Sequence, residues 1–227
     1  MKIKFLILFY FTTTLVLIVS IFGLFSSYKK FRFFLNLLTN SMLMSLKLSS
    51  KITVEVINHD KDNVDEGYLY ASKHQSIFET IYFNSLFYNP AYILKKELLN
   101  IPLFGQYLKK LEMIAIDRSQ GIKSIKHVNE ETKRLSKFRP VVIFPEGTRT
   151  TYGDQPDLKP GIYSIYKNSN KPVIPIAINS GKYWPKNNQM QSGKITIEFK
   201  EPIQPGLSKE EFLKKLKIEI NSLNHSE

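Results

Sequence analysis

Cysteine is absent from this 227-residue chain. That absence excludes disulfide bridges, four-thiolate zinc or iron–sulfur sites and a cysteine nucleophile. The Gly-x-Ser-x-Gly turn that presents a serine nucleophile is also missing. The sequence therefore offers no obvious group for covalent catalysis.

Acidic residues are absent from residues 1–50, which carry six lysines and arginines. The whole chain has 32 Lys+Arg against 20 Asp+Glu, so half of its net charge of +12 lies in this fifth of the chain. Residues 5–25 carry no charge, and an uncharged helix of this length, at about 1.5 Å per residue, spans the roughly 30 Å hydrocarbon core of a bilayer. We expect a membrane-spanning or deeply inserted helix.

A cleaved signal peptide is the alternative for this segment. The apolar run ends without a small-residue cleavage pattern, so we expect the segment to be retained. Lys29, Lys30 and Arg32 follow directly, which favours a cytoplasmic position for the rest of the chain. The expected location is the cell inner membrane, with the following domain on its cytoplasmic face.

Residues 31–48 are apolar around most of a helical circumference and carry only two cations. Such a helix can lie in the membrane interface, or it can pack on the globular part as a core helix. Both alternatives stay open at this point. The chain then divides into an N-terminal membrane anchor, residues 1–50, and a globular domain, residues 51–227.

The globular part alternates short β-rich runs with helical stretches, which predicts an α/β domain: a mixed, largely parallel sheet flanked by helices. The expected strands are Ile52–Ile57, Tyr68–Ser72, Ala91–Leu94, Met113–Ile116, Val141–Phe144, Val173–Ile178 and Ile195–Phe199. The expected helices are Ile77–Phe87, Lys96–Lys110, Ile122–Lys137, Gly161–Asn168 and Lys209–Leu223, the last with a capping box formed by Ser208 and Glu211.

His74 follows the strand predicted at Tyr68–Ser72, and this end of a strand is where open α/β sheets hold reactive groups. If His74 lies in the turn before a helix that begins at Ile77, Glu79 can accept a hydrogen bond from one ring nitrogen and make the other more basic. Ser76 and Glu79 also form a capping-box pattern, in which Glu79 binds the Ser76 amide instead.

Arginine is scarce, with five of the 32 cations, so each arginine marks a place where a planar, two-pronged donor is useful. Arg118 follows an apolar strand directly after Asp117. Arg149 ends the segment Phe144-Pro145-Glu146-Gly147-Thr148-Arg149, a strand followed by a glycine turn. A turn with backbone amides, a hydroxyl and an arginine is suited to bind phosphate.

His74-x4-Glu79, Ile116-Asp117-Arg118, Phe144–Arg149 and Val173–Ile178 occur in the order of four motif blocks, and the chain resembles the glycerolipid acyltransferase family over about residues 68–180. The resemblance implies acyl transfer from acyl-CoA or acyl-carrier protein to the sn-2 hydroxyl of 1-acylglycerol-3-phosphate (lysophosphatidic acid), giving phosphatidic acid. The first motif of the family usually ends in Asp, whereas this chain has Glu79.

The resemblance also implies roles for individual residues. His74 is expected to act as the base and Glu79 to orient it, without a cofactor or a metal. The phosphate-binding residues are expected to be Arg118, Glu146, Gly147, Thr148 and Arg149, with Lys95 as a further candidate. The acceptor would come from membrane lipid.

Two other readings compete. The acceptor could instead be glycerol-3-phosphate, another lysophospholipid or a lyso-aminolipid. The chain could also be a non-catalytic basic protein at a membrane, but residues 51–227 carry 26 cations and 20 anions spread along the chain. Because a nucleic-acid binder would gather its cations on one face, we expect no nucleic-acid partner.

Overall fold

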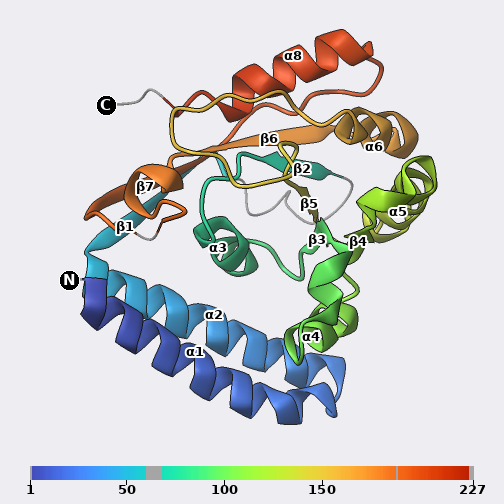
Figure 1. The fold of residues 1–227 in the computed structure, drawn as a ribbon. Helices are drawn as coiled ribbons and strands as arrows, with labels where there is room; N and C mark the ends of the chain where they lie inside the picture. Colours follow the sequence, from blue (N-terminus) through green and yellow to red (C-terminus); the bar gives the residue numbers. More distant parts are fainter. Residues whose placement is uncertain (1, 60–67, 188, 225–227) are drawn as a thin grey trace.

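The computed structural model describes residues 2–59, 68–187 and 189–224. Over these residues the strands form one sheet of order β1-β7-β6-β2-β5-β3-β4 (Figure 1). Neighbouring strands are parallel except β6 and β7, so the predicted mixed, largely parallel sheet is confirmed. The strands are β1 Ile52–Ile57, β2 Leu69–Ser72, β3 Ala91–Lys95, β4 Ile114–Ile116, β5 Val141–Ile143, β6 Val173–Ile178 and β7 Gly193–Phe199.

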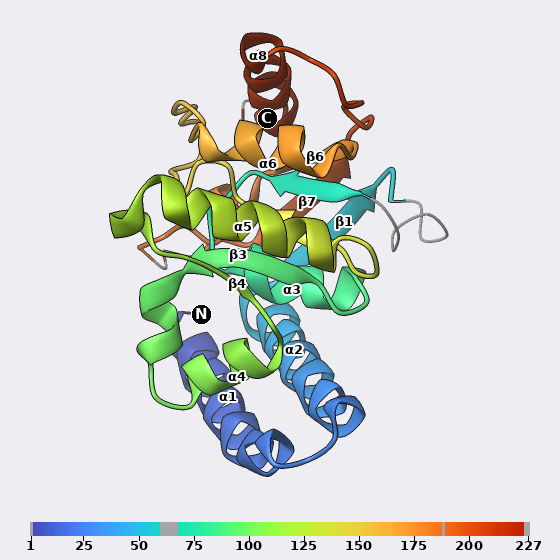
Figure 2. The ribbon, with the colours of Figure 1, turned by 90° about the vertical axis from the view of Figure 1, so that its right-hand side faces the viewer.

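Helices cover both faces of the sheet. The α1–α2 hairpin and α3 lie beneath it in Figures 1 and 2, and α6 and α8 lie above it. The helices are α1 Lys2–Leu24, α2 Tyr28–Ser50, α3 Phe78–Leu86, α4 Phe104–Lys110, α5 Ile122–Leu135, α6 Gly161–Ser169, α7 Ser180–Tyr183 and α8 Lys209–Ile220. The predicted capping box of α8 forms between Ser208 and Glu211.

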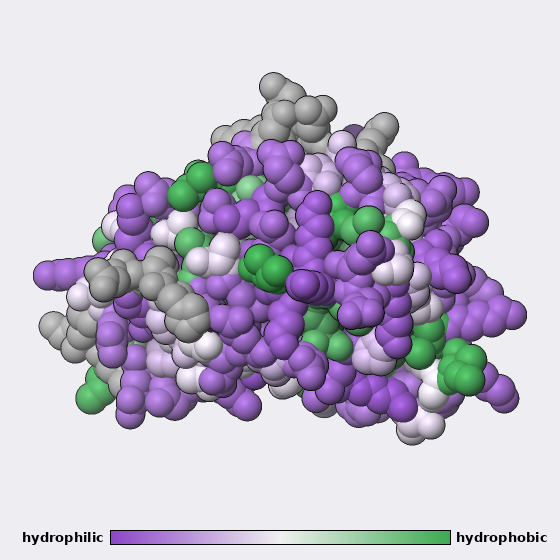
Figure 3. All heavy atoms as spheres, turned by 90° about the horizontal axis from the view of Figure 1, so that it is seen from above, coloured by the Kyte–Doolittle hydropathy of each residue, from purple (hydrophilic) through white to green (hydrophobic). Residues whose placement is uncertain are grey.

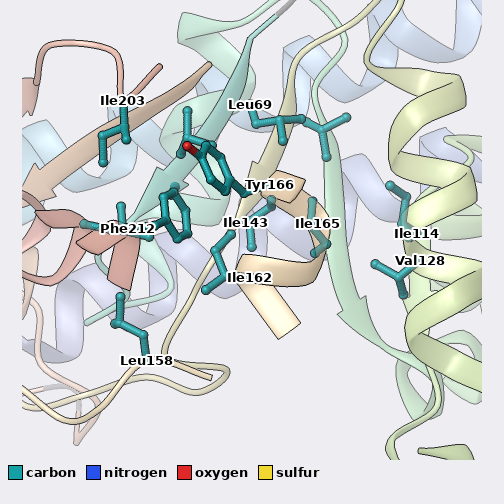
Figure 4. Close-up of a cluster of buried hydrophobic side chains, with 14 of the residues drawn as sticks. Leu69, Ile114, Val128, Ile143, Leu158, Ile162, Ile165, Tyr166, Ile203 and Phe212 are labelled. Atoms are coloured by element: carbon teal, nitrogen blue, oxygen red, sulfur yellow. The ribbon is translucent and has the colours of Figure 1, made fainter. Parts of the chain in front are cut away.

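The sheet separates two hydrophobic cores, and the central strand β2 contributes to both. Leu69 and Ala71 point into the core beneath α5, α6 and α8, part of which is drawn in Figure 4. Tyr70 points into the opposite core, against residues of α3 such as Phe78. All four residues of β2 are buried, because alternate side chains of a strand face opposite sides and both sides are covered.

The single helix predicted at Lys96–Lys110 is wrong. A 3₁₀ turn occupies Lys96–Asn100, and α4 begins only at Phe104. Pro102 lies between the two pieces and supplies no amide for a continuous helix. Leu103 then has a φ of 63°, which ends any regular helical path before α4 starts.

The α1–α2 hairpin is attached to the domain at both ends of α2. Near its beginning, Lys110 of α4 donates to the carbonyl oxygens of Gly23, Leu24 and Ser26 at 3.0, 2.6 and 2.7 Å. Near its end, α2 packs on α3 and buries Leu46. One side of residues 31–48 therefore packs on the globular part, and the interfacial alternative stays a prediction for the exposed side.

Among the residues that the structure describes, no helix is both long and apolar enough to cross a membrane. The predicted spanning segment is not confirmed and stays a prediction. The chain leaves α2 through Lys51, whose φ of 51° turns it directly into β1. This turn coincides with the predicted division between residues 1–50 and 51–227, which also stays a prediction.

The packing of α8 predicts the effect of a single substitution. Phe212 is fully buried and stacks on Tyr166 with ring centroids 4.0 Å apart. Phe212→Ala should lower the free energy of unfolding by about 3–5 kcal/mol, because it leaves a cavity at the base of α8. Ile218→Ala, on the exposed side of the same helix, should change it by less than about 0.5 kcal/mol. Urea unfolding followed by circular dichroism measures both, and equal losses would contradict this account.

Candidate active site

The register between β2 and β5 determines which residues meet at the candidate site. Leu69 lies opposite Val141 and Ala71 opposite Ile143, so the same parallel offset brings His74 opposite Glu146 just beyond the strand ends. The His74 amide donates to Oε2 of Glu146 at 3.0 Å. Two motifs far apart in the sequence thus meet because their strands are neighbours.

The His74 ring lies against Phe144, with ring centroids 4.1 Å apart, and its side chain is 15% exposed. Nδ1 is 3.7 Å from Oε1 of Glu79. Within the described part of the chain, Nδ1 is buried and has no hydrogen-bond partner. A small movement would let an Nδ1 proton bind Glu79, which leaves Nε2 to accept a proton from a substrate.

Glu79 is fully buried at the start of α3, and it also accepts hydrogen bonds from nearby backbone amides. Its Oε1 accepts from the amides of Gln75 and Ser76 at 2.6 and 3.0 Å. Glu79 therefore binds the Ser76 amide, as the capping alternative predicts, whereas the predicted hydrogen bond to His74 is not formed at a separation of 3.7 Å. The N-terminal cap is Ile77 rather than Ser76, and α3 begins at Phe78, one residue later than predicted.

Arg118 reaches the glycine turn after β5. Its Nη2 donates to the Gly147 carbonyl at 2.7 Å. Gly147 has a φ of 71°, and a Cβ there would lie 2.9 Å from Arg118 Nη2 and 3.2 Å from Cγ of Lys159. Glycine therefore allows the arginine to pass close to the turn. Lys159, which lies beside the same turn, was not predicted from the sequence.

The other predicted phosphate-binding residues lie at the same edge of the sheet. Thr148 is exposed and Arg149 half-buried, directly after Gly147 in the turn. Lys95 is exposed at the end of β3, in line with Pro145 by the register of β3 and β5. These positions follow from the shared direction of β2, β3, β4 and β5, whose carboxyl ends meet at this edge.

Asp117 fixes the turn that carries Arg118. Its side chain accepts from Oγ and the amide of Ser119 at 2.6 and 3.1 Å, and Lys96 lies 3.0 Å from its other oxygen. The hydrogen bonds from Ser119 and Lys96 lower the pKa of Asp117 to about 2. The carboxylate is therefore ionised throughout the physiological range.

Glu146 is buried, and both of its carboxylate oxygens accept hydrogen bonds from other residues of the protein. Oε1 accepts from Nζ of Lys73 at 2.5 Å and lies 3.3 Å from Oγ1 of Thr150, while Oε2 accepts from the His74 amide. The sequence analysis did not single out Lys73 or Thr150. The one available signal was the position of Lys73 at the end of a strand buried on both faces.

The site is thus a histidine beside a buried carboxylate, with arginines on the next turns, at the carboxyl edge of an open α/β sheet. This arrangement is that of an α/β protein in which a histidine and cationic side chains share one edge of the sheet. The chain matches the family model described as Acyltransferase over residues 53–179. The chain belongs to this acyltransferase family.

Known proteins resemble the chain to different extents. A 1-acyl-sn-glycerol-3-phosphate acyltransferase of Pseudomonas aeruginosa is 43% identical over 51% of this chain and 45% of its own length. One from Bacillus subtilis is 32% identical over 69% of this chain and 76% of its own length. The chain thus spans less than half of the Pseudomonas relative that it matches.

A crystal structure from Thermotoga maritima shares the whole fold. That protein, the 1-acyl-sn-glycerophosphate acyltransferase PlsC, superposes with a TM-score of 0.77. The match covers 99% of this chain and 96% of that one at 22% identity. The similarity extends over the N-terminal hairpin as well as the sheet.

Proposed function

We propose that the protein transfers an acyl chain from a thioester donor, acyl-CoA or acyl-carrier protein, to the sn-2 hydroxyl of 1-acylglycerol-3-phosphate, forming phosphatidic acid. The observation that carries the proposal is the His74 ring at the edge of the sheet, with Nδ1 3.7 Å from the buried Glu79. Membership of the acyltransferase family and the names of the similar proteins support it.

The chemistry is a direct transfer. His74 Nε2 takes the hydroxyl proton of the acceptor while the hydroxyl oxygen forms a bond to the thioester carbonyl carbon. Glu79 stabilises the imidazolium that results. The tetrahedral intermediate then collapses, the carbon–sulfur bond breaks, and the imidazolium returns its proton to the departing sulfur. The products are the ester and a free thiol.

The phosphate of the acceptor would bind at the glycine turn. Arg118 uses one of its nitrogens on the Gly147 carbonyl and keeps further donors for an anion. Arg149, Thr148 and Lys95 lie on the same edge of the sheet and would complete the pocket, which restricts the acceptor to the orientation that presents its hydroxyl to His74.

The N-terminal hairpin would hold this site at a membrane, on the cytoplasmic face of the inner membrane. Large apolar side chains are exposed on both helices of the hairpin, including Ile7, Phe11 and Ile18 on α1 and Phe33 and Leu48 on α2. The opposite face of the molecule, over α8, is mainly hydrophilic (Figure 3). An apolar surface of this kind is typical of contact with lipid.

The first prediction concerns His74. Membranes containing the wild-type chain should form phosphatidic acid from labelled palmitoyl-CoA and lysophosphatidic acid, and His74→Ala should lower the rate about a hundredfold or more because the base is lost. His127→Ala, at an exposed histidine of α5, should keep the wild-type rate. If the wild type forms no product, acyl-carrier protein and competing acceptors are tested next, and failure there would contradict the proposal.

A second prediction separates phosphate binding from chemistry. Arg149→Lys should raise KM for lysophosphatidic acid roughly tenfold and change kcat less than about threefold, because an ammonium cannot reproduce a two-pronged contact. Arg134→Lys is the matched control, since Arg134 pairs with Glu131 on the surface of α5. Steady-state kinetics with detergent-dispersed acceptor measures both. An unchanged KM would remove Arg149 from the pocket.

A third prediction concerns the hairpin. The double variant Phe11→Asp/Phe33→Asp should lower activity on acceptor in anionic vesicles about tenfold, because two exposed apolar contacts with lipid are lost. Activity on detergent-dispersed acceptor should stay within about twofold of wild type. Ile218→Asp, an exposed apolar residue of α8, should leave both activities unchanged. Equal losses on both substrates would exclude lipid contact as the role of this surface.

A further inference from the structure

Lys73 is a fully buried lysine whose ammonium group has three acceptors. Nζ donates to Oε1 of Glu146 at 2.5 Å, to Oδ1 of Asn221 at 2.7 Å and to the Asp154 carbonyl at 2.7 Å. Three bonds use all the donors of an ammonium group, so this buried charge is fully paired. Its acceptors come from segments 73, 81 and 148 residues away.

The Lys73 ammonium group fixes the Glu146 carboxylate, and this carboxylate in turn binds the backbone amide of His74. Glu146 accepts the His74 amide through Oε2, as described above. On the other side, Thr150 donates its amide and its hydroxyl to the His74 carbonyl at 2.8 and 3.1 Å. The backbone of His74 is thus fixed at both its amide and its carbonyl, which sets the direction of the side chain.

The residue after the histidine is held by the same part of the chain. The amide nitrogen of the Gln75 side chain donates to Oδ1 of Asn224 at 2.7 Å, and its oxygen accepts from the Gly181 amide at 3.0 Å. Asn224 in turn donates to Oδ1 of Asn221 at 2.8 Å. The two asparagines are 5% and 2% exposed and link to each other beneath the catalytic turn.

Asn221 and Asn224 lie directly after α8, beyond the segment that matches the family model. The burial of α8 does not require them, since Phe212, Leu216 and Ile220 already anchor the helix in the core. Apolar groups of similar volume would stabilise a buried position as well as a charged network does. Asn221 also donates to the Lys217 carbonyl at 2.6 Å and so supports the end of α8, but its bond to Lys73 is not needed for that purpose.

We propose that Asn221 and Asn224 are positioning residues for acyl transfer. They hold Lys73 and Gln75, the neighbours of His74 on both sides, and so aim the imidazole at the acceptor. The inference rests on the proposed function and assigns part of it to the C-terminal helix. Neither asparagine contacts the substrate in this account, and both act through the backbone on either side of the base.

The test uses Asn221→Leu and Asn224→Leu in the full chain. Each should lower kcat about tenfold or more and leave KM for lysophosphatidic acid within about twofold, because a displacement of the base of about 1 Å costs up to a hundredfold in rate. Asn221→Asp keeps an acceptor for Lys73 and should recover much of the lost kcat. Phe212→Leu is the control, because it destabilises the same helix without touching the network and should keep the wild-type kcat below its melting temperature.

A second readout makes the test independent of turnover. The imidazole nitrogen resonances of His74, identified by their absence in His74→Ala, should shift in the asparagine variants and stay in place in Phe212→Leu. An inactive wild type would count against the proposed function, while these resonances would still decide the positioning role.

If Asn221→Leu does not fold, Asn224→Leu, which leaves the three bonds of Lys73 in place, decides alone. A wild-type kcat together with unshifted His74 resonances in the folded variants would overturn the proposal. The proposal would also be overturned if Phe212→Leu lowers kcat as much as the asparagine variants do.

Discussion

The parallel pairing of β2 with β5 is the constraint on which the rest of the site depends. Their register puts His74 beside Glu146, whose carboxylate is buried away from water. A buried carboxylate needs a partner, and Lys73 supplies it from the residue before the histidine. The pair therefore ties the backbone of the proposed base to the turn that carries Arg149.

Glu79 shows how one carboxylate can serve structure and chemistry together. It accepts from the amides of Gln75 and Ser76, in the turn before α3, and lies beside Nδ1 of His74. The capping bonds leave the carboxylate little freedom, so its position relative to the ring is set by the backbone itself. The helix begins at Phe78, four residues after the histidine, so Glu79 lies in its first turn.

Local patterns predicted the strands and the meeting of the motifs well. β1 and β6 have the predicted bounds, because each is a mainly β-branched run, although β6 contains Pro175. The helix predicted across Pro102 was wrong because proline has no amide to continue a helix and the following Leu103 has a φ of 63°. The position of Lys73 at a strand end did not by itself predict its role, since its partners come from distant segments of the chain.

Only helix α3 lies between the proposed lipid-facing hairpin and Glu79, the carboxylate beside His74. α2 packs directly on α3, and α3 carries Glu79 in its first turn. Lys110 ties the opposite end of the hairpin to α4, which follows the strand that ends at Lys95. A hairpin seated in lipid would therefore orient both the base and the phosphate-binding edge relative to the bilayer. A lipid acceptor that stays in the bilayer would then reach a site that already faces the bilayer. Binding would require little further reorientation of the acceptor.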